Sequence, residues 1–380
     1  MIKGFKIRIY PNKEQERKIW EHIDASRFIW NYMLDLQERR FKNGEKHLSA
    51  FDMNRLVTVL KKKDEYLWLN NVSTATLHRR CSDLDKAYQR AFKKISNFPT
   101  FKTRKRSKKS YPVRDSIGRV WFDEKTVTIP NVGKIKYKTD FKIPYGNEVK
   151  FLNPRISYIN NKWILSINMN CDNQTIKLTK KIMGIDLGIK ETATVAYGKN
   201  ILVFHNINKS KKMKNLDRRI KHLQRNIARK YESNKQGKKY IKTNNIIKEE
   251  AILRKMYAKQ RNIRQNYIHQ MTHQLISLRP CKIIMEDLNV MGLMKNRHMS
   301  KAIQEQCFYE IIRQMKYKCE WSGIKFILAN RFYPSSKTCS SCGCVNSNLK
   351  LKDRKFICPE CGFVIDRDEN AAINLMRYSI

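Results

Sequence analysis

Two cysteine pairs near the carboxyl end constrain the local fold of this chain more than any other feature. Cys339-Ser-Ser-Cys342 and Cys358-Pro-Glu-Cys361 are separated by fifteen residues, which is the spacing of a four-cysteine zinc ribbon. A glycine follows each pair and permits the tight turn that lets both thiolates reach one ion. The pattern predicts one structural Zn²⁺ with no open position, held by Cys339, Cys342, Cys358 and Cys361. A redox C-x-x-C motif is the alternative.

The other cysteines and the hydropathy pattern indicate the compartment. Six cysteines are scattered, at positions 81, 171, 281, 307, 319 and 344, which favours a reducing compartment over a disulfide framework. Of these, Cys344 is near enough to the pairs to compete as a ligand but lies off their repeat. The sequence has no run of 18 uncharged apolar residues, and its first residues lack a signal-peptide core. We therefore expect a cytoplasmic protein without a membrane partner.

The charge predicts a polyanionic partner. Lys and Arg number 79 against 34 Asp and Glu, a net charge of +45 over 380 residues. Like charges repel in a compact state, and a modest DNA-binding module contacts only about 6–10 phosphates. This excess indicates a long structured RNA or several turns of duplex DNA; a generally basic protein is the alternative. The length predicts two to three domains, and 41% hydrophobic residues exclude a wholly disordered chain.

The amino-terminal half has the pattern of a small β-barrel interrupted by helices. Residues 3–10 alternate apolar and basic side chains and predict a strand that Pro11 ends. Helical periodicity starts at Asn12 and returns from Ser73 to about Ile95. Short strands with turn residues between them recur from 118 to 171. We expect the first strand to close the barrel, with the helical residues 13–98 inserted after it.

Basic side chains gather on helical faces and in one run. The run from Lys102 to Lys109 follows Pro99, and six of its eight residues are Lys or Arg. A solvated linker or solvated helix face is the alternative to nucleic-acid contact. The candidate nucleic-acid contacts are His78, Arg79, Arg80, Lys102, Arg104, Lys105, Arg106, Lys108, Lys109, Arg218, Arg219, Arg225 and Lys337.

The carboxyl-terminal half predicts a mixed sheet flanked by helices. Five strands are indicated, at residues 182–185, 192–197, 201–204, 282–285 and 325–328. Long helical patterns lie on either side of the fourth strand, including one at about 301–321, and a last helix starts near Glu369.

Acids follow two of these strands and precede the last helix. Asp186 follows Ile185, Glu286 follows Met285, and Asp368 lies at the expected helix start. Clustered carboxylates repel unless cations lie between them, and Mg²⁺ prefers oxygen ligands. Two such ions stabilise the attacking and leaving oxygens of phosphodiester displacement. A turn residue, a surface acid and a helix N-cap are the respective alternatives.

Two neighbouring acids are rivals for these positions. Asp287 follows Glu286 directly, and strand side chains alternate, so only one of the two can face the metals. Asp366 lies two residues before Asp368.

Four motifs in order resemble the TnpB (OrfB) family of insertion-sequence transposons, which is similar to the compact type V CRISPR effectors. They are Gly184-Ile-Asp-Leu-Gly-Ile-Lys190, Met285-Glu-Asp-Leu-Asn289, Tyr333-Pro-Ser-Ser-Lys-Thr-Cys-Ser-Ser-Cys-Gly343 and Asp366-Arg-Asp-Glu-Asn-Ala-Ala372. Together they span about half of the chain. The early Arg-Ile-Tyr-Pro and the basic run after Phe98-Pro99 extend the resemblance towards the amino terminus.

The resemblance implies an α/β multidomain fold. A RuvC-like, ribonuclease-H-type nuclease domain would occupy residues 179–330 and 363–380, with a zinc-ribbon target-nucleic-acid-binding insert at 331–362. A wedge β-barrel would occupy 1–12 and 112–178, with a helical recognition insert at 13–111.

The resemblance also implies the activity, an RNA-guided DNA endonuclease that depends on Mg²⁺. Its two-metal catalytic and Mg²⁺-binding triad would be Asp186, Glu286 and Asp368; Asp368 is preferred to Asp366 because the family pattern is Asp-x-Asn-Ala-Ala. Asn370 would support this triad from outside it. The partners would be a long structured guide RNA and a double-stranded DNA target that lies beside a short motif read by the protein. The protein and its guide RNA would form a monomeric ribonucleoprotein.

Three other functions remain open from the sequence. A guide-independent structure-specific nuclease or a transposase would use the same acids and metals. A non-cleaving RNA-guided DNA-binding repressor would account for the charge and the zinc but leave the acids without a function.

Overall fold

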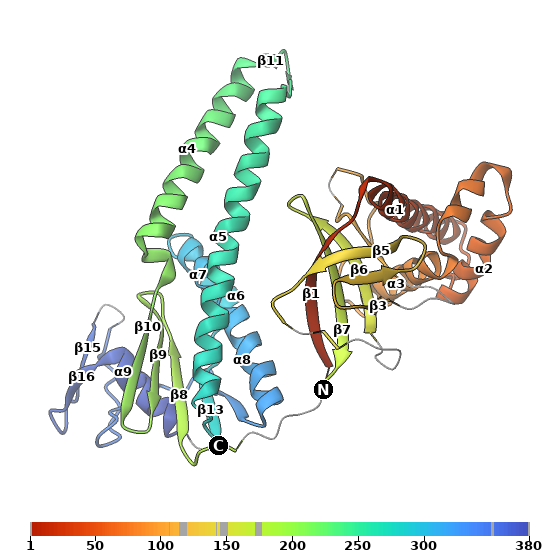
Figure 1. Cartoon of the computed structure of the whole chain (residues 1–380). Helices are drawn as coiled ribbons and strands as arrows, with labels where there is room; N and C mark the ends of the chain where they lie inside the picture. Colours follow the sequence, from red (N-terminus) through yellow and green to blue (C-terminus); the bar gives the residue numbers. More distant parts are fainter. Residues whose placement is uncertain are drawn as a thin grey trace. The chain divides into compact units, whose positions relative to one another are not determined.

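The computed structural model describes residues 2–105, 107–113, 120–141, 143–144, 151–171, 177–350 and 353–378. The chain forms two compact units, residues 1–172 and 173–380, whose elements are labelled in Figure 1. Arg106, one of the candidate nucleic-acid contacts, lies outside the described residues. The division into four domains drawn from the sequence stays a prediction.

A seven-stranded antiparallel sheet forms one part of the first unit. Its strands are β1 (Ile2–Tyr10), β2 (Ser110–Pro112), β3 (Trp121–Phe122), β4 (Thr126–Ile129), β5 (Gly133–Lys138), β6 (Phe151–Ile159) and β7 (Lys162–Asn170). Their order is β2-β6-β7-β1-β5-β4-β3, so the first strand lies in the middle of the sheet, between β7 and β5, and joins its two halves. The rings of Phe122 on β3 and Phe151 on β6 lie 4.9 Å apart, because the sheet curls around one core.

A two-residue turn joins β6 and β7. Asn160 and Asn161 both have positive φ, 51° and 60°, the conformation that a two-residue turn between twisted strands requires.

Helices are inserted between β1 and β2, as predicted. They are α1 (Lys13–Lys42), α2 (Ala50–Leu60), the 3₁₀ helix η1 (Asp64–Asn71) and α3 (Thr74–Phe92). Helix α1 begins at Asn12, whose side chain accepts from the backbone N–H of Gln15 while the Gln15 side chain returns the contact. The four elements share a separate apolar core. The sequence patterns did not identify α2.

The second unit contains the predicted five-stranded mixed sheet. Its strands are β8 (Ile182–Leu187), β9 (Glu191–Tyr197), β10 (Asn200–His205), β13 (Lys282–Glu286) and β14 (Lys325–Ala329), in the order β10-β9-β8-β13-β14. Strands β8, β13 and β14 are parallel, and β9 and β10 are antiparallel additions.

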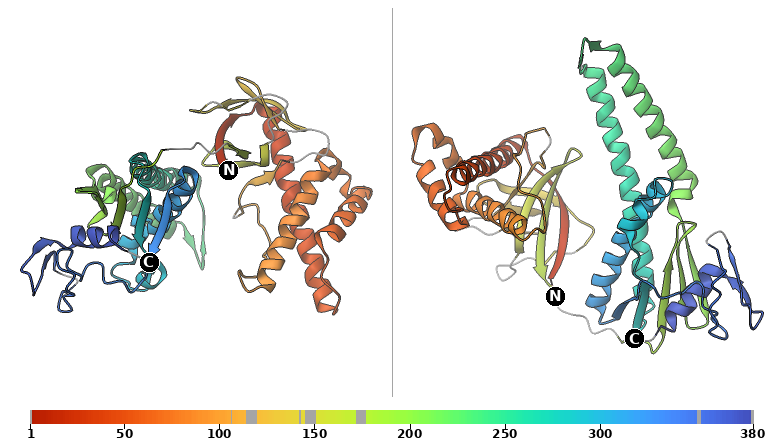
Figure 2. Two further views of the ribbon diagram at one scale, coloured as in Figure 1. Left: turned by 90° about the horizontal axis from the view of Figure 1, so that it is seen from below. Right: turned by 180° about the vertical axis from the view of Figure 1, so that it is seen from behind.

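Helices cover both faces of this sheet, and the right-hand view of Figure 2 shows the sheet between α8 and α9. The helices are η2 (Ile207–Lys209), α4 (Lys211–Ser233), α5 (Asn244–Ser277), α6 (Val290–Met294), α7 (Ser300–Gln306), α8 (Phe308–Ser322) and α9 (Arg367–Met376). Helices α4 and α5 form a long hairpin with the two short strands β11 (Lys235–Gln236) and β12 (Lys239–Tyr240) at its tip (Figure 1). The main core lies on the α5 and α8 face.

The prediction of one helix over residues 301–321 was wrong. Helix α7 ends and α8 begins at Cys307, which has φ of 56°. The buried Gln306 side chain donates to the Ile189 carbonyl at 3.1 Å. This contact fixes the end of α7 against the sheet, so α8 starts in a new direction. In the part of the chain that the structure describes, no helix is long and apolar enough to span a bilayer.

Candidate active site and metal centre

Helix α9 packs against one face of β8 at a glycine. A Cβ on Gly184 would collide with the backbone of α9 at Ala372 and Met376, so only glycine allows this approach. Side chains alternate along a strand, and Asp186 is two residues after Gly184. Asp186 therefore lies on the α9 face of the sheet, whereas Met183 and Ile185 enter the core on the opposite face.

Glu286 lies beside Asp186 on the neighbouring strand. Strands β8 and β13 are parallel, and their register pairs Ile185 with Met285. The next residue of each strand is Asp186 or Glu286, so the two carboxylates stand on adjacent strands at the same level. Two residues before Glu286, Ile284 packs with Leu375 of α9, which places Glu286 on the same face.

The two rival acids have other partners. Asp287 follows Glu286 and forms an ion pair with Arg331, at 2.7 Å between Oδ2 and Nη2. Asp366 is the N-cap of α9: its side chain accepts from the backbone N–H groups of Asp368 and Glu369. The alternative in which Asp368 itself caps the helix is thus wrong, because Asp366 occupies that position.

Asp368 lies in the first turn of α9, on the side that covers β8. Residues four apart share one face of a helix, and Ala372, four residues after Asp368, is the residue that meets Gly184. The Asp368 side chain is about one-fifth exposed and lies 3.5 Å from the guanidinium of Arg367. Three acids that are distant in sequence therefore converge on one face, at the ends of β8 and β13 and at the start of α9.

The electrostatics of the site reflect this convergence. Burial, followed by the nearby carboxylates of Glu286 and Asp368, raises the pKa of Asp186 to about 8, and Arg367 opposes the shift. Burial and the charge of Asp287 raise the pKa of Glu286. A cluster of this kind holds its negative charge poorly without cations.

The donor set fits divalent cations that prefer oxygen ligands. Three carboxylates partly withdrawn from solvent supply such ligands, and a cation between them would remove their mutual repulsion. Their oxygen atoms are not gathered as closely as the cysteine sulfurs described next. Two ions about 3.5–4 Å apart are held by carboxylates spread more widely than one ion requires.

The four predicted cysteines form the second constellation. Across the described residues, Cys339, Cys342, Cys358 and Cys361 are the group whose possible metal-ligand atoms all lie within 4.8 Å of one another. The Sγ atoms of Cys339 and Cys361 are 3.7 Å apart, and those of Cys342 and Cys358 are 3.5 Å apart. Tetrahedral Zn²⁺ with sulfur at about 2.3 Å separates its ligands by about 3.8 Å.

This cluster fits a structural zinc site. Backbone N–H groups of Cys361 and Glu360 lower the pKa of Cys358, which favours the thiolate that zinc requires. The neighbouring thiols of Cys361 and Cys358 raise the pKa of Cys342, because thiolates held this close repel one another unless a cation lies between them. All ten cysteines are free thiols, and Cys344 lies outside the four-sulfur group.

Two buried asparagines attach the cysteine module to α9. The Asn370 amide donates to the Thr338 carbonyl at 2.7 Å and accepts from the Ser340 N–H at 3.0 Å. Asn374 donates to the carbonyls of Ser335 and Thr338, at 2.8 and 2.6 Å. The Asn370 side chain thus bonds to the turn around the first cysteine. Its support of the three acids stays a prediction.

The basic candidates of the first unit occupy different environments. Arg80 is 7% exposed and donates to the Ser110 carbonyl at 3.1 Å, so it is a buried residue of α3. Arg79 lies 3.7 Å from Asp83. The N–H of Lys102 bonds to Asn31 of α1 at 2.8 Å, which anchors the start of the basic run. The run is therefore not a freely solvated linker.

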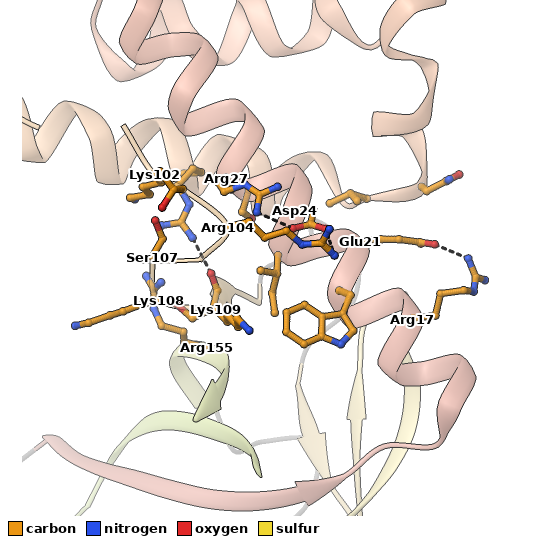
Figure 3. Close-up of a pocket in the computed structure, with 18 of the residues that line it drawn as sticks. Arg17, Glu21, Asp24, Arg27, Lys102, Arg104, Ser107, Lys108, Lys109 and Arg155 are labelled. Atoms are coloured by element: carbon orange, nitrogen blue, oxygen red, sulfur yellow. Dashed lines mark hydrogen bonds and ion pairs between the residues drawn. The ribbon is translucent and has the colours of Figure 1, made fainter. Parts of the chain in front are cut away.

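Residues of the basic run line a cavity of about 880 Å³ against α1 (Figure 3). From the candidates, Arg80, Lys102, Arg104, Lys108 and Lys109 line it; His78, Arg79 and Lys105 do not. Sequence reasoning missed three further basic residues of this cavity, Arg17, Arg27 and Arg155. The spacing of these three residues along the chain does not indicate that they share a site, because only the tertiary fold brings β6 and α1 next to the basic run.

The basic candidates of the second unit lie on α4 and in the cysteine module. Arg218 and Arg219 line a smaller hollow of about 390 Å³ between α4 and α5, and Arg225 follows on α4. Lys337 donates to the Ser347 carbonyl at 3.1 Å, within the cysteine module.

Three family models match the chain. The OrfB_IS605 model, described as "Probable transposase", matches residues 166–297, and a Cas12f1-like TNB domain matches 308–375. The HTH_OrfB_IS605 model, described as a helix-turn-helix domain, matches 1–46. In the structure these 46 residues contain β1 and the single helix α1.

Two curated relatives align over nearly the whole chain. "Putative RNA-guided DNA endonuclease" of Streptomyces pristinaespiralis is 26% identical over 98% of this chain and 88% of its own length. "Putative RNA-guided DNA endonuclease InsQ" of Escherichia coli K12 is 26% identical over 99% of this chain and 92% of its own. The solved Cas12f1-sgRNA-target DNA complex has a similar fold, with a TM-score of 0.62, 13% identity and coverage of 99% and 98%.

The chain is a mixed α/β protein with a fold similar to that of Cas12f1, and its cysteine module lies in the segment that matches the Cas12f1-like TNB domain. Two segments of the chain match OrfB_IS605 models, and the relatives that align over nearly its whole length are named RNA-guided DNA endonucleases. These similarities agree with the resemblance of its sequence motifs to the TnpB (OrfB) family.

Proposed function

We propose that this protein is an RNA-guided DNA endonuclease that cuts both strands of a target duplex with one active site. The observation that carries the proposal is the placement of Asp186, Glu286 and Asp368 on one face of the second unit's sheet. The two relatives that align over nearly the whole chain are named as putative RNA-guided DNA endonucleases, which supports the proposal.

The three carboxylates would hold two Mg²⁺ ions, which supply charge stabilisation for the attacking and leaving oxygens of phosphodiester hydrolysis. Asp186 and Glu286, on adjacent strands, would present oxygens from the floor of the site. Asp368 would present its oxygens from the start of α9. Arg367 lies beside Asp368 and would orient a substrate phosphate.

Several finer assignments belong to the same proposal. The five-stranded sheet with α5, α8 and α9 would be the RuvC-like nuclease domain, and the curled sheet of the first unit the wedge barrel. A single zinc ion would hold the cysteine module in shape. The basic faces of α4 and α5, including Arg218, Arg219 and Arg225, would contact the guide RNA. A monomeric ribonucleoprotein in the cytoplasm is the expected working form.

Cleavage assays with guide RNA test the proposal. Asp186→Ala should abolish Mg²⁺-dependent cleavage of a matched duplex while leaving RNA and target binding within about twofold. Cleavage by the variant at the wild-type rate would contradict the proposal. Sequencing the RNA that co-purifies with the protein supplies the guide for the assay.

The same assay separates the alternatives. A guide-independent nuclease would cut branched DNA after RNase treatment, and a transposase would join DNA ends. A repressor would bind the target without Mg²⁺-dependent cleavage. Each of these outcomes would replace the proposed activity.

A further inference from the structure

We propose that the cavity between α1 and the basic run is a binding pocket for a single unpaired nucleotide. The inference rests on the proposed nucleic-acid substrate but not on the nuclease chemistry, which belongs to the second unit. The cavity is built entirely from the first unit: α1, η1, Val72, α3, β6 and residues 102–104 and 107–110 contribute its walls.

The charge of the cavity calls for an anion. Eight basic side chains and two acidic ones line it, an excess of six basic groups. The two acids are already engaged by basic neighbours: Glu21 pairs with Arg17, and Asp24 lies 3.1 Å from Arg27 and 3.9 Å from Arg104. Figure 3 shows Arg104 beside Asp24, with Lys102, Lys108 and Lys109 on the adjoining segment.

Basic side chains at the inner wall of the cavity outnumber the carboxylates that neutralise them. Arg80 and Arg155 both contact the single carboxylate of Asp83, at 3.4 and 3.2 Å. Lys102 is stacked on the Trp30 ring at 3.0 Å and is repelled by both guanidinium groups. Like charges held together away from solvent destabilise one another, and a phosphate would relieve this repulsion.

Two buried polar atoms in the wall are without a hydrogen-bond partner among the described residues. Ser26 is fully buried and Arg80 is 7% exposed, and both line the cavity. Within the described residues, neither Ser26 Oγ nor Arg80 Nε has a hydrogen-bond partner. Buried polar groups are nearly always hydrogen-bonded, so these atoms indicate a polar ligand that completes the site.

Aromatic walls and volume indicate a nucleotide rather than a simple anion. Trp20 and Trp68 both line the cavity, and Trp68 is 42% exposed, which leaves an indole available for base stacking. A volume of about 880 Å³ suits a ligand of cofactor size. A base-paired duplex, whose major groove alone is about 12 Å wide, does not fit inside. A nucleotide that has left its helix does, with its base against indole and its phosphate against guanidinium groups.

Binding of bulged and fully paired probes tests the inference. Full-length protein is titrated without Mg²⁺ against labelled duplexes of about 16 base pairs, with or without one central unpaired nucleotide, as DNA and as RNA. Fluorescence anisotropy at elevated salt suppresses non-specific phosphate binding. We expect the bulged probe to bind about tenfold more tightly than the paired probe. The DNA and RNA arms show whether target or guide supplies the nucleotide.

Matched variants assign the preference to the cavity. Lys109→Gln and Trp68→Leu should reduce the ratio to about twofold or less, whereas Trp68→Phe should retain most of it. Lys105→Gln removes the same charge from the same run but does not line the cavity, so it should leave the ratio unchanged. Equal binding of both probes by the wild type, or an undiminished ratio in both Lys109→Gln and Trp68→Leu, would overturn the inference. Asp186→Ala should leave the ratio intact, which separates this result from failure of the nuclease proposal.

Discussion

The buried side chain of Asn370 in α9 holds the Thr338 carbonyl at 2.7 Å, one residue before the first cysteine of the metal cluster. The same amide accepts from Ser340 at 3.0 Å, one residue after that cysteine. The helix that carries Asp368 thus also clamps both sides of Cys339. The geometry of the candidate active site and that of the cysteine cluster are therefore linked through one side chain.

Removing this clamp should loosen the metal centre. Asn370→Ala leaves the buried Ser340 N–H without its partner, at about 1–3 kcal/mol, and leaves the Thr338 carbonyl with the Asn374 amide as its side-chain donor. We expect a lower unfolding temperature and faster zinc release to a chromogenic chelator. Asn346→Ala is the control, because the Asn346 side chain bonds to Ile357 on the exposed side of the module. Equal zinc-release rates for the two variants would contradict the clamp.

Substitution of Gly184 should disrupt the second unit. In Gly184→Ala the new methyl group meets the α9 backbone at Ala372 and Met376, and neither strand nor helix backbone can move aside cheaply. Overpacking of this kind costs about 1–3 kcal/mol or more and separates Asp368 from Asp186. Chemical denaturation and cleavage assays should both show the loss. Gly4→Ala serves as control, since its methyl group meets only the Asn168 side chain.

The two acids at the start of α9 should respond differently to the same change. Asp366→Asn keeps the N-cap, because asparagine caps helices as well as aspartate, so stability and cleavage should remain near wild type. Asp368→Asn removes a carboxylate from the proposed metal site and should abolish cleavage with little effect on unfolding. Loss of cleavage in Asp366→Asn alone would reverse the assignment.

Loss of zinc should destabilise the cysteine module. Cys339→Ser removes one of four sulfur ligands, and the short segment between the pairs is too small to fold without them. We expect reduced solubility, less than one zinc per chain by elemental analysis, and loss of cleavage. Cys344→Ser, whose sulfur lies outside the cluster, should retain zinc. Full zinc occupancy in Cys339→Ser would exclude the four-cysteine site.

Lys102 should make the first unit more stable as the pH rises. Burial, with repulsion from Arg80 and Arg155 and partial relief from Asp83, lowers the pKa of Lys102 to about 7, far below the value of about 10.4 in an unfolded chain. Between these values the unfolded state binds the extra proton, so stability increases with pH. The slope of unfolding free energy from pH 7 to 9 should be smaller in Lys102→Gln. Identical slopes would show that Lys102 does not titrate in this range.

Much of the chain's local structure could be predicted from sequence because the rules act over short distances. Asn12 and Gln15 form their capping box from residues three apart. Short apolar runs predicted the strands that end near Asp186 and Glu286. The spacing of the cysteine pairs predicted a cluster that the structure gathers within 4.8 Å. Helix α2 and the break at Cys307 escaped prediction because contacts outside their own segments, such as Gln306 with Ile189, decide them.

The sequence by itself determined which chemical groups this protein has, namely four thiols at ligand spacing and acids at the ends of apolar strands. Only the tertiary structure decided which of them meet. The close packing of α9 over Gly184 turns Asp368 towards the sheet while Asp366 caps the helix. The fold also brings Arg155 of β6 to Arg80 and Lys102, which no spacing along the chain foretells. Side-chain direction and convergence depend on long-range packing, and that information is absent from any short stretch of sequence.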